Sequence, residues 1–143
     1  LSRKKGSKMT GRQVQYARVS RVENFMSMLI AKQGISRHVS IDSMPVTIRA
    51  EWEDMVLIDV GKGKDMDAYN QFSVNVFLYA KPKGDLQQKD VKKLDWMEEL
   101  LDKAIGECND THYHPSINWR DSDYDDIRNF HFNVINLSVT VTE

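Results

Sequence analysis

The sequence contains very little cysteine and no long apolar segment. Cys108 is the single cysteine among 143 residues, which excludes an internal disulfide framework. The longest apolar runs, Met55 to Ile58 and Val76 to Ala80, are short, whereas a membrane-spanning helix needs about 20 apolar residues. The basic start of the chain is not followed by an apolar segment, so we expect no signal peptide. These absences predict a protein that works without a membrane and without disulfide bonds.

The composition is that of a globular protein. Apolar residues make up 41% of the chain and charged residues 29%, values that argue against global disorder. Five Phe, five Tyr and three Trp supply large side chains for a core. A chain of this length fits one domain and can bury about 70% of its unfolded surface.

Charge is distributed unevenly, although the formal net charge is only −1. Residues 1–22 hold seven of the 20 Lys and Arg residues and no acid, which leaves 13 basic and 21 acidic residues, a net charge of −8, for the rest of the chain. Residues 1–12 also contain two glycines and few apolar side chains, so we predict a flexible basic arm there and a single folded domain over 13–143. A basic arm on an acidic body is typical of a chain that binds a partner.

The first half of the domain is predicted to hold one helix followed by strands. Apolar residues recur every three or four positions over 13–33, and Gly34 then provides a stop. The Gly-, Lys- and Asp-rich residues 61–70 predict an exposed hairpin tip. Strand patterns occur between the helix and this tip, in the segments 39–41, 46–50 and 55–60.

The second half begins with the strongest strand pattern and the clearest helix pattern of the chain. Both alternating faces of Gln71 to Ala80 are rich in apolar side chains, so we expect a helix or another subunit on each side of that strand. Asp90 is a suitable N-cap for an amphipathic helix that ends near Gly106. Residues 107–126 are polar, and only a short strand over 113–119 is predicted within them.

The last segment, 127–142, is predicted to be one long strand. Its apolar alternation changes phase between Val134 and Ile135, which predicts a β-bulge at that point. Helices are few, and hairpin-like loops separate the strands. We therefore predict an α+β fold, with an antiparallel or mixed sheet on which an N-terminal helix and one central amphipathic helix pack.

Three short patterns in the sequence contain residue types that bind metal ions or phosphate. Cys108, His112 and His114 offer the ligand types that zinc prefers, but a fourth ligand at motif spacing is missing. The D-x-D-x-D run from Asp121 opens like an EF-hand loop, yet the required Gly and Glu do not follow. The Gly-Lys-Gly-Lys run from residue 61 lacks the phosphate-loop spacing. We expect no metal, no cofactor, no small-molecule substrate and no enzymatic role.

The residues selected for interaction are therefore charged rather than catalytic. The basic arm can bind the acidic surface of a neighbouring copy of the chain. An alternative is that the arm binds nucleic acid, although no known DNA-reading motif accompanies it. The candidate interaction residues are Arg3, Lys4, Lys5, Lys8, Arg12, Asp121, Asp123, Asp125 and Asp126.

The order of segments resembles that of the small phage tail-terminator and tail-completion proteins, which join heads and tails. The resemblance covers roughly 13–143 and rests on three segments, the strand FSVNVFLYAKPKG, the helix KKLDWMEELLDKAIGE and the final strand FHFNVINLSVTVTE. It implies a virion structural protein without catalytic residues, which assembles into a ring, often a hexamer, in the phage tail or neck. Its partners would be copies of itself and adjacent tail-tube or connector proteins, and DNA would pass through the lumen. The arm is not part of the family pattern.

Overall fold

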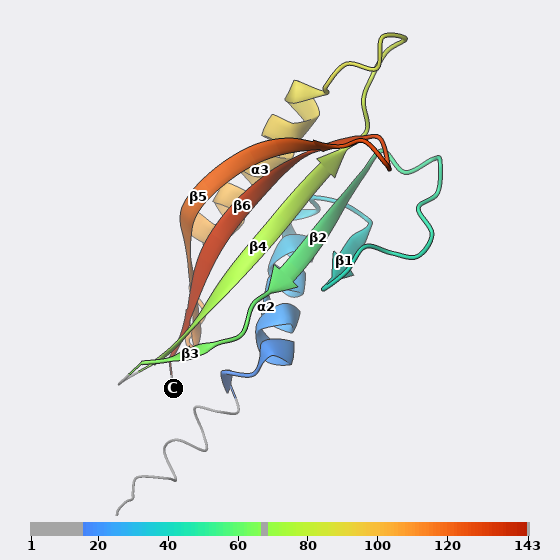
Figure 1. The fold of residues 1–143 in the computed structure, drawn as a ribbon. Helices are drawn as coiled ribbons and strands as arrows, with labels where there is room; N and C mark the ends of the chain where they lie inside the picture. Colours follow the sequence, from blue (N-terminus) through green and yellow to red (C-terminus); the bar gives the residue numbers. More distant parts are fainter. Residues whose placement is uncertain (1–15, 67–68, 143) are drawn as a thin grey trace, which may run out of the picture.

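The computed structural model describes residues 16–66 and 69–142 of the chain. Within them, two helices lie on one face of a six-stranded mixed sheet, so the predicted α+β class is confirmed (Figure 1). In chain order the elements are α2 (Val19–Gln33), β1 (Val39–Ile41), β2 (Asp54–Val60), β3 (Lys64–Asp65), β4 (Asn70–Ala80), α3 (Val91–Gly106), β5 (Tyr113–Asp125) and β6 (Phe130–Val141).

The sheet is ordered β1-β2-β4-β6-β5, and β3 pairs with the start of β4. Strand β1 runs parallel to β2, whereas all other pairs are antiparallel. The longest strands, β4, β5 and β6, are neighbours, so most of the ladder lies in the second half of the chain. The strand that follows α3 lies at the edge of the sheet, and the last strand lies between it and β4.

Helix α2 begins at Val19, within the segment predicted to be helical, and buries Val22, Met26 and Ile30 at four-residue spacing. The predicted stop is confirmed, because Gly34 caps the helix with φ 65° and donates its N–H to the carbonyl of Ala31. This left-handed conformation is one that glycine adopts without the steric cost of a Cβ atom. The predicted helical residues 13–15 lie outside the described part of the chain.

Helix α3 confirms the second helix prediction. The side chain of Asp90 accepts a hydrogen bond from the N–H of Lys93 and so caps the first turn. The buried side of the helix is formed by Leu94, Met97, Leu101 and Ala104. No helix of the part of the chain that the structure describes is long and apolar enough to cross a membrane.

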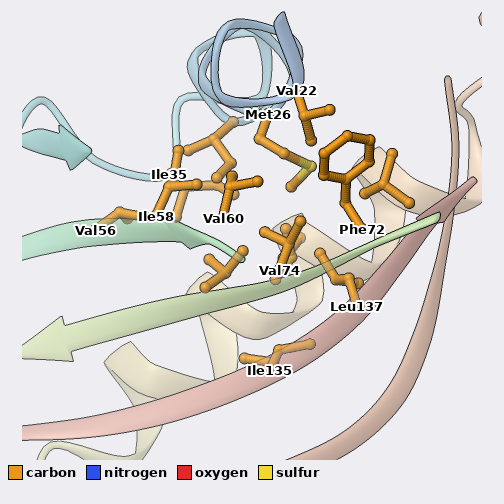
Figure 2. Close-up of a cluster of buried hydrophobic side chains, with 14 of the residues drawn as sticks. Val22, Met26, Ile35, Val56, Ile58, Val60, Phe72, Val74, Ile135 and Leu137 are labelled. Carbon is orange, nitrogen blue, oxygen red and sulfur yellow. The ribbon is translucent and has the colours of Figure 1, made fainter. Parts of the chain in front are cut away.

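The main core lies between the two helices and the sheet (Figure 2). Four alternating side chains of β4, from Phe72 to Leu78, are at most 1% exposed and face the helices. Burial of each large apolar side chain contributes about 1.5–3 kcal/mol to stability. Figure 2 shows the helix side chains Val22 and Met26 facing the sheet near Val60 and Phe72. The same core extends across the sheet through Val74, Leu137 and Ile135.

The opposite face of the sheet, which no described helix covers, carries a second apolar cluster of Met55, Leu57, Tyr79 and Phe130. The segment that joins β1 to β2 packs Met44, Ile48 and Trp52 against it. The predicted cover of strand 71–80 by a helix is confirmed on the first face. On the second face a loop of the same chain packs against the apolar cluster, in the place expected for a helix or another subunit.

The strand predicted over 46–50 is wrong, because these residues belong to this covering loop. Their alternation of apolar side chains does not reflect a buried sheet face. Ile48 packs against the second cluster, whereas Val46 is fully exposed. Apolar and polar side chains therefore alternate here although the residues form no strand.

The β-bulge predicted at Val134–Ile135 is also wrong. The ladder between β4 and β6 runs without interruption from the pair Asn70 and Val141 to the pair Ala80 and His131. The apolar phase changes because Phe130 and Phe132 belong to the second cluster, whereas Ile135 faces the main core. One regular strand thus buries different faces at its two ends.

The region predicted to be mostly irregular, 107–126, contains instead the 13-residue strand β5. Strand β5 pairs with β6 along its whole length, and the bulge of this sheet lies here, between Ile117 and Trp119. The prediction of a short strand over 113–119 therefore covered only about half of the element.

The hairpin predicted over 61–70 is confirmed in the residues that the structure describes. Strand β3 pairs Lys64 with Gln71 and Asp65 with Asn70. Gly63 lies directly against the ring of Phe72, where an added Cβ atom would come within 2.5 Å of two ring carbons. The absence of a side chain at this position lets the hairpin approach the core.

Candidate interaction surface

Strand β5 forms one edge of the sheet and is the most exposed of its long strands (orange in Figure 1). It pairs with β6, and no other strand of the described residues borders its outer side. A strand at an edge presents a row of unpaired N–H and C=O groups that can pair with another chain. The side of β5 that faces away from β6 is therefore a natural surface for an added strand.

Three of the predicted acidic residues lie in this edge strand and not in a loop, which corrects the predicted location. Asp121, Asp123 and Asp125 alternate along β5 and therefore point to the same face of the sheet. Their partners on β6 are Val134, Phe132 and Phe130, so this is the face without helices. The fourth acidic residue, Asp126, is exposed in the turn that follows.

Two of these carboxylates have no positively charged partner among the described residues. The Oδ1 atoms of Asp121 and Asp123 each accept a hydrogen bond of 2.8 Å from the N–H of the next residue, and both side chains are exposed. Asp125 differs, because it accepts from the N–H groups of Ile127 and Arg128 and forms an ion pair of 2.9 Å with the Arg128 guanidinium. Asp125 thus organises the β5–β6 turn, whereas Asp121 and Asp123 are available to a partner.

On its other face, β5 is fixed to helix α3 by Arg120. The guanidinium donates to Glu98 at 2.9 Å and to both carboxylate oxygens of Asp102 at 2.9 and 3.3 Å. The hydrogen bonds that Arg120 donates to Asp102 are the main reason that the pKa of Arg120 lies above its usual value. Partial burial lowers this pKa, and the hydrogen bond to Glu98 raises it further. These ion pairs are partly solvated, so they orient the strand more than they stabilise the fold.

Large apolar side chains are exposed around the acidic residues. Trp119 is 49% exposed, Tyr124 43% and Ile127 87%. Trp119 shares the helix-free face with Asp121 and Asp123, whereas Tyr124 points to the other face and Ile127 lies in the turn. The end of β5 nearest the turn thus has a mixed acidic and apolar character. We call this surface, formed by Trp119, Asp121, Asp123, Tyr124 and Ile127, the β5 acidic edge.

The predicted basic residues Arg3, Lys4, Lys5, Lys8 and Arg12 lie outside the described part of the chain. The chain enters the described part at Tyr16, whose ring stacks on His112 at 3.9 Å between centroids. The hydroxyl of Tyr113, the first residue of β5, donates to the carbonyl of Tyr16 at 3.0 Å. The segment that follows the arm is thus held against the beginning of β5.

The zinc pattern considered in the sequence does not form a ligand cluster. His112 Nδ1 lies 3.2 Å from the carbonyl of Thr142, and His114 Nε2 lies 3.1 Å from the hydroxyl of the same residue. Cys108 Sγ lies 3.9 Å from the carbonyl of Tyr113. Over the described ranges, no group of three His, Cys, Asp or Glu side chains is placed to hold a metal ion.

A cysteine nucleophile would need a histidine base beside it, but Cys108 and His131 lie at opposite ends of the sheet. Cys108 contacts Tyr113, which pairs with Val141 at the end of β6, whereas His131 lies near the beginning of that strand. Burial is the main cause that lowers the pKa of His131, and the charge of Lys89 adds to it. This pair therefore offers no nucleophilic site.

No protein-family model and no curated protein matches this chain. The function of the chain is therefore inferred from the physical properties of the β5 acidic edge and of the basic N-terminal segment. Sequence reasoning found the acidic residues of this edge but missed Trp119, Tyr124 and Ile127. An extension of the predicted strand from 119 to 125 would have placed Trp119 on the same face as Asp121 and Asp123, and Tyr124 on the opposite face.

Proposed function

We propose that this chain is a structural virion protein whose copies assemble into a ring at the tail or neck of a phage, where it acts in tail termination or head–tail joining. The observation that carries the proposal is the separation of two complementary surfaces. Basic residues are concentrated in 1–22, and Asp121 and Asp123 lie without cationic partners from the described residues on an exposed edge strand.

A contact between these two surfaces is heterologous, because each copy donates one surface and receives at the other. Such contacts close into a ring when the rotation between neighbours allows it. The charged hairpin tip around β3 and the turn after β5 would face the lumen or a neighbouring ring of tail-tube or connector proteins. DNA would pass through the lumen, and the site of action would be the virion.

The test is the native mass of the full chain and of a variant that lacks residues 1–12, measured by light scattering and native mass spectrometry. We expect a closed oligomer for the full chain and a lower mass after the deletion. A monomer in both preparations would contradict the proposal.

A milder variant separates charge from chain length. Lys4, Lys5 and Lys8 are changed to Gln, and the matched control carries the same changes at three exposed lysines of the body, Lys62, Lys89 and Lys92. We expect the oligomer to weaken only when the lysines of the arm are changed. Equal effects of the two triple variants would show that net charge, and not the arm, controls assembly.

A nucleic-acid-binding module is the second candidate. The observation that favours it is that Arg18 and Arg21 are exposed near the start of α2 and extend the basic segment. Binding of DNA through phosphates weakens steeply with salt. Salt-sensitive DNA binding that disappears on deletion of residues 1–12, in a chain that stays monomeric, would favour this candidate over the ring.

A further inference from the structure

The outer side of β5 is long enough to accept a whole additional strand. The element has 13 residues, and its outer backbone groups face no strand of the described part of the chain. An extended peptide can add to such an edge by main-chain hydrogen bonds, while side chains on alternate positions give specificity. The question is which peptide the edge selects.

The charges of β5 oppose the pairing of one β5 strand with another. An antiparallel pair centred on Asp123 would place Asp121 of each copy opposite Asp125 of the other. Like charges directly opposite one another destabilise a strand pair. The acidic edge therefore selects against a copy of itself and favours a strand that carries positive charge.

Residues 1–12 have the required chemistry. They contain five basic residues, no acid and no proline, so they offer positive side chains without loss of a backbone donor. In an extended conformation, 12 residues span about 40 Å at roughly 3.3 Å per residue, which matches the length of β5. Four of the five basic residues fall within the short run Arg3 to Lys8.

The exposed apolar side chains indicate that the strand comes from a neighbouring copy. Residues 1–12 contain only two apolar side chains, Leu1 and Met9. They are too few to cover Trp119, Tyr124 and Ile127 beside the edge. A neighbouring copy that approaches with its arm also brings its folded body, which can cover them.

We infer that residues 1–12 of a neighbouring copy add to the outer side of β5 as an extra strand, with their basic side chains beside Asp121 and Asp123. This inference rests on the proposed ring, and it names the receiving surface and the type of contact. The interface consists of main-chain hydrogen bonds, charge pairs on the face without helices, and apolar contacts at the end of the strand.

The test is cross-linking between two single-cysteine variants of the full chain, both made in a Cys108→Ser background. One variant carries Ser7→Cys in the arm and the other carries Asp121→Cys in β5. The two proteins are mixed and treated with a short bis-maleimide, and the mixed product is identified by mass. A cross-linker tolerates a shift of register by a residue or two. A mixed product can form only between copies.

The matched control replaces Asp121→Cys with Asp95→Cys, which removes the same charge at an exposed position on α3. Because docking raises the effective concentration of the two thiols, we expect about tenfold more mixed product with Asp121→Cys than with Asp95→Cys. A third protein, with Ser7→Cys and Asp121→Cys in one chain, shows whether the arm reaches its own β5. Equal yields for the two acceptors, or cross-links only within one chain, overturn the inference.

Light scattering of the same samples separates this inference from the proposed function. A closed oligomer whose mixed cross-link shows no preference for Asp121→Cys leaves the ring standing and rejects β5 as the receiving edge. A monomer rejects the ring itself, and the inference fails with it. Preferential cross-linking within a closed oligomer supports both.

Discussion

The hydrogen bonds of Asn136 allow a direct test of how polar side chains stabilise the face of the sheet that no described helix covers. Asn136 is only 7% exposed, and the side chains that it bonds are polar. Its Nδ2 group donates to Asn75 Oδ1 at 2.8 Å and to Ser73 Oγ at 3.1 Å, and its Oδ1 accepts from Asn118 Nδ2 at 2.9 Å. One side chain thus links β4, β6 and β5.

The expected cost of Asn136→Ala follows from these three bonds. A typical hydrogen bond contributes about 1 kcal/mol net, so three lost bonds set an upper value of about 3 kcal/mol. The actual cost should be smaller, because Asn118 keeps its bond of 2.8 Å to Ser138 and exposed Ser73 can bind water. We therefore expect the free energy of unfolding to fall by about 1–2 kcal/mol.

Urea unfolding, followed by circular dichroism, measures this loss. With a slope of about 2 kcal/mol per molar urea, the middle of the usual range, the midpoint should fall by about 0.5–1 M. The control is a double-mutant cycle with Asn118→Ala, which should show a coupling of about 0.5–1 kcal/mol because the two side chains are bonded. An unchanged midpoint for Asn136→Ala, or no coupling with Asn118→Ala, would refute the network as described.

Three further predictions concern stability and titration, and urea unfolding measures the first two. Gly34→Ala should lower stability by about 1 kcal/mol through backbone strain alone, because φ is 65° and no atom lies within 4 Å of the added Cβ. Phe72→Ala should cost about 3–5 kcal/mol, and Phe77→Ala at the half-buried position on the other face should cost clearly less. Burial is the main cause that raises the pKa of both Tyr79 and Tyr113 above 10.0. Ultraviolet titration should therefore find two tyrosines that lose their protons at higher pH than the others. Their contribution to stability is complete below pH 10 and is lost as the pH rises through the raised pKa values, which thermal unfolding at increasing pH would detect.

The features that could be predicted from the sequence are those that depend on a few adjacent residues. Gly34 and Asp90 were identified as helix ends, and both caps are present in the structure. A cap needs only one residue type at the right place in the local backbone. The apolar stripe of α3 was equally recognisable, because its spacing repeats over the whole helix.

The features that could not be predicted depend on what the rest of the chain covers. The phase change in β6 suggested a bulge, because the sequence does not reveal that Met55 and Tyr79 form an apolar cluster on the second face. The strand over 46–50 failed for a related reason, since Ile48 covers that same cluster from a loop. In both cases the apolar alternation was real, but the residues that these apolar side chains contact lie far away in the sequence.

Strand β5 escaped prediction because its order comes from pairing with β6 and not from its own composition. Most of its side chains are exposed, and an edge strand needs few apolar residues of its own. The candidate acidic residues were identified as a charged group, yet the common face of Asp121, Asp123 and Asp125 depends on their being in a strand. Arg120, which fixes this strand to α3, carried no recognisable signal in the sequence.

Acidic side chains on an edge strand have a second physical role, since they also prevent copies from aggregating through that edge. The two roles predict opposite results for the pair of substitutions Asp121→Asn and Asp123→Asn. If the carboxylates receive a basic strand, their neutralisation weakens the closed oligomer and smaller species appear. If they only keep edges apart, the oligomer persists and large, irregular aggregates form in addition.

Sedimentation velocity distinguishes these outcomes, because it resolves smaller species, the closed oligomer and aggregates in one run. Asp125 must be left unchanged, since it holds the β5–β6 turn through two backbone N–H groups and Arg128. The matched control is Asp95→Asn with Glu99→Gln, two exposed positions on α3 that undergo the same change in charge. We expect dissociation to smaller species with the β5 pair and an unchanged profile with the α3 pair. Aggregation without dissociation of the variant with Asp121→Asn and Asp123→Asn would contradict the charge complementarity on which the ring proposal depends.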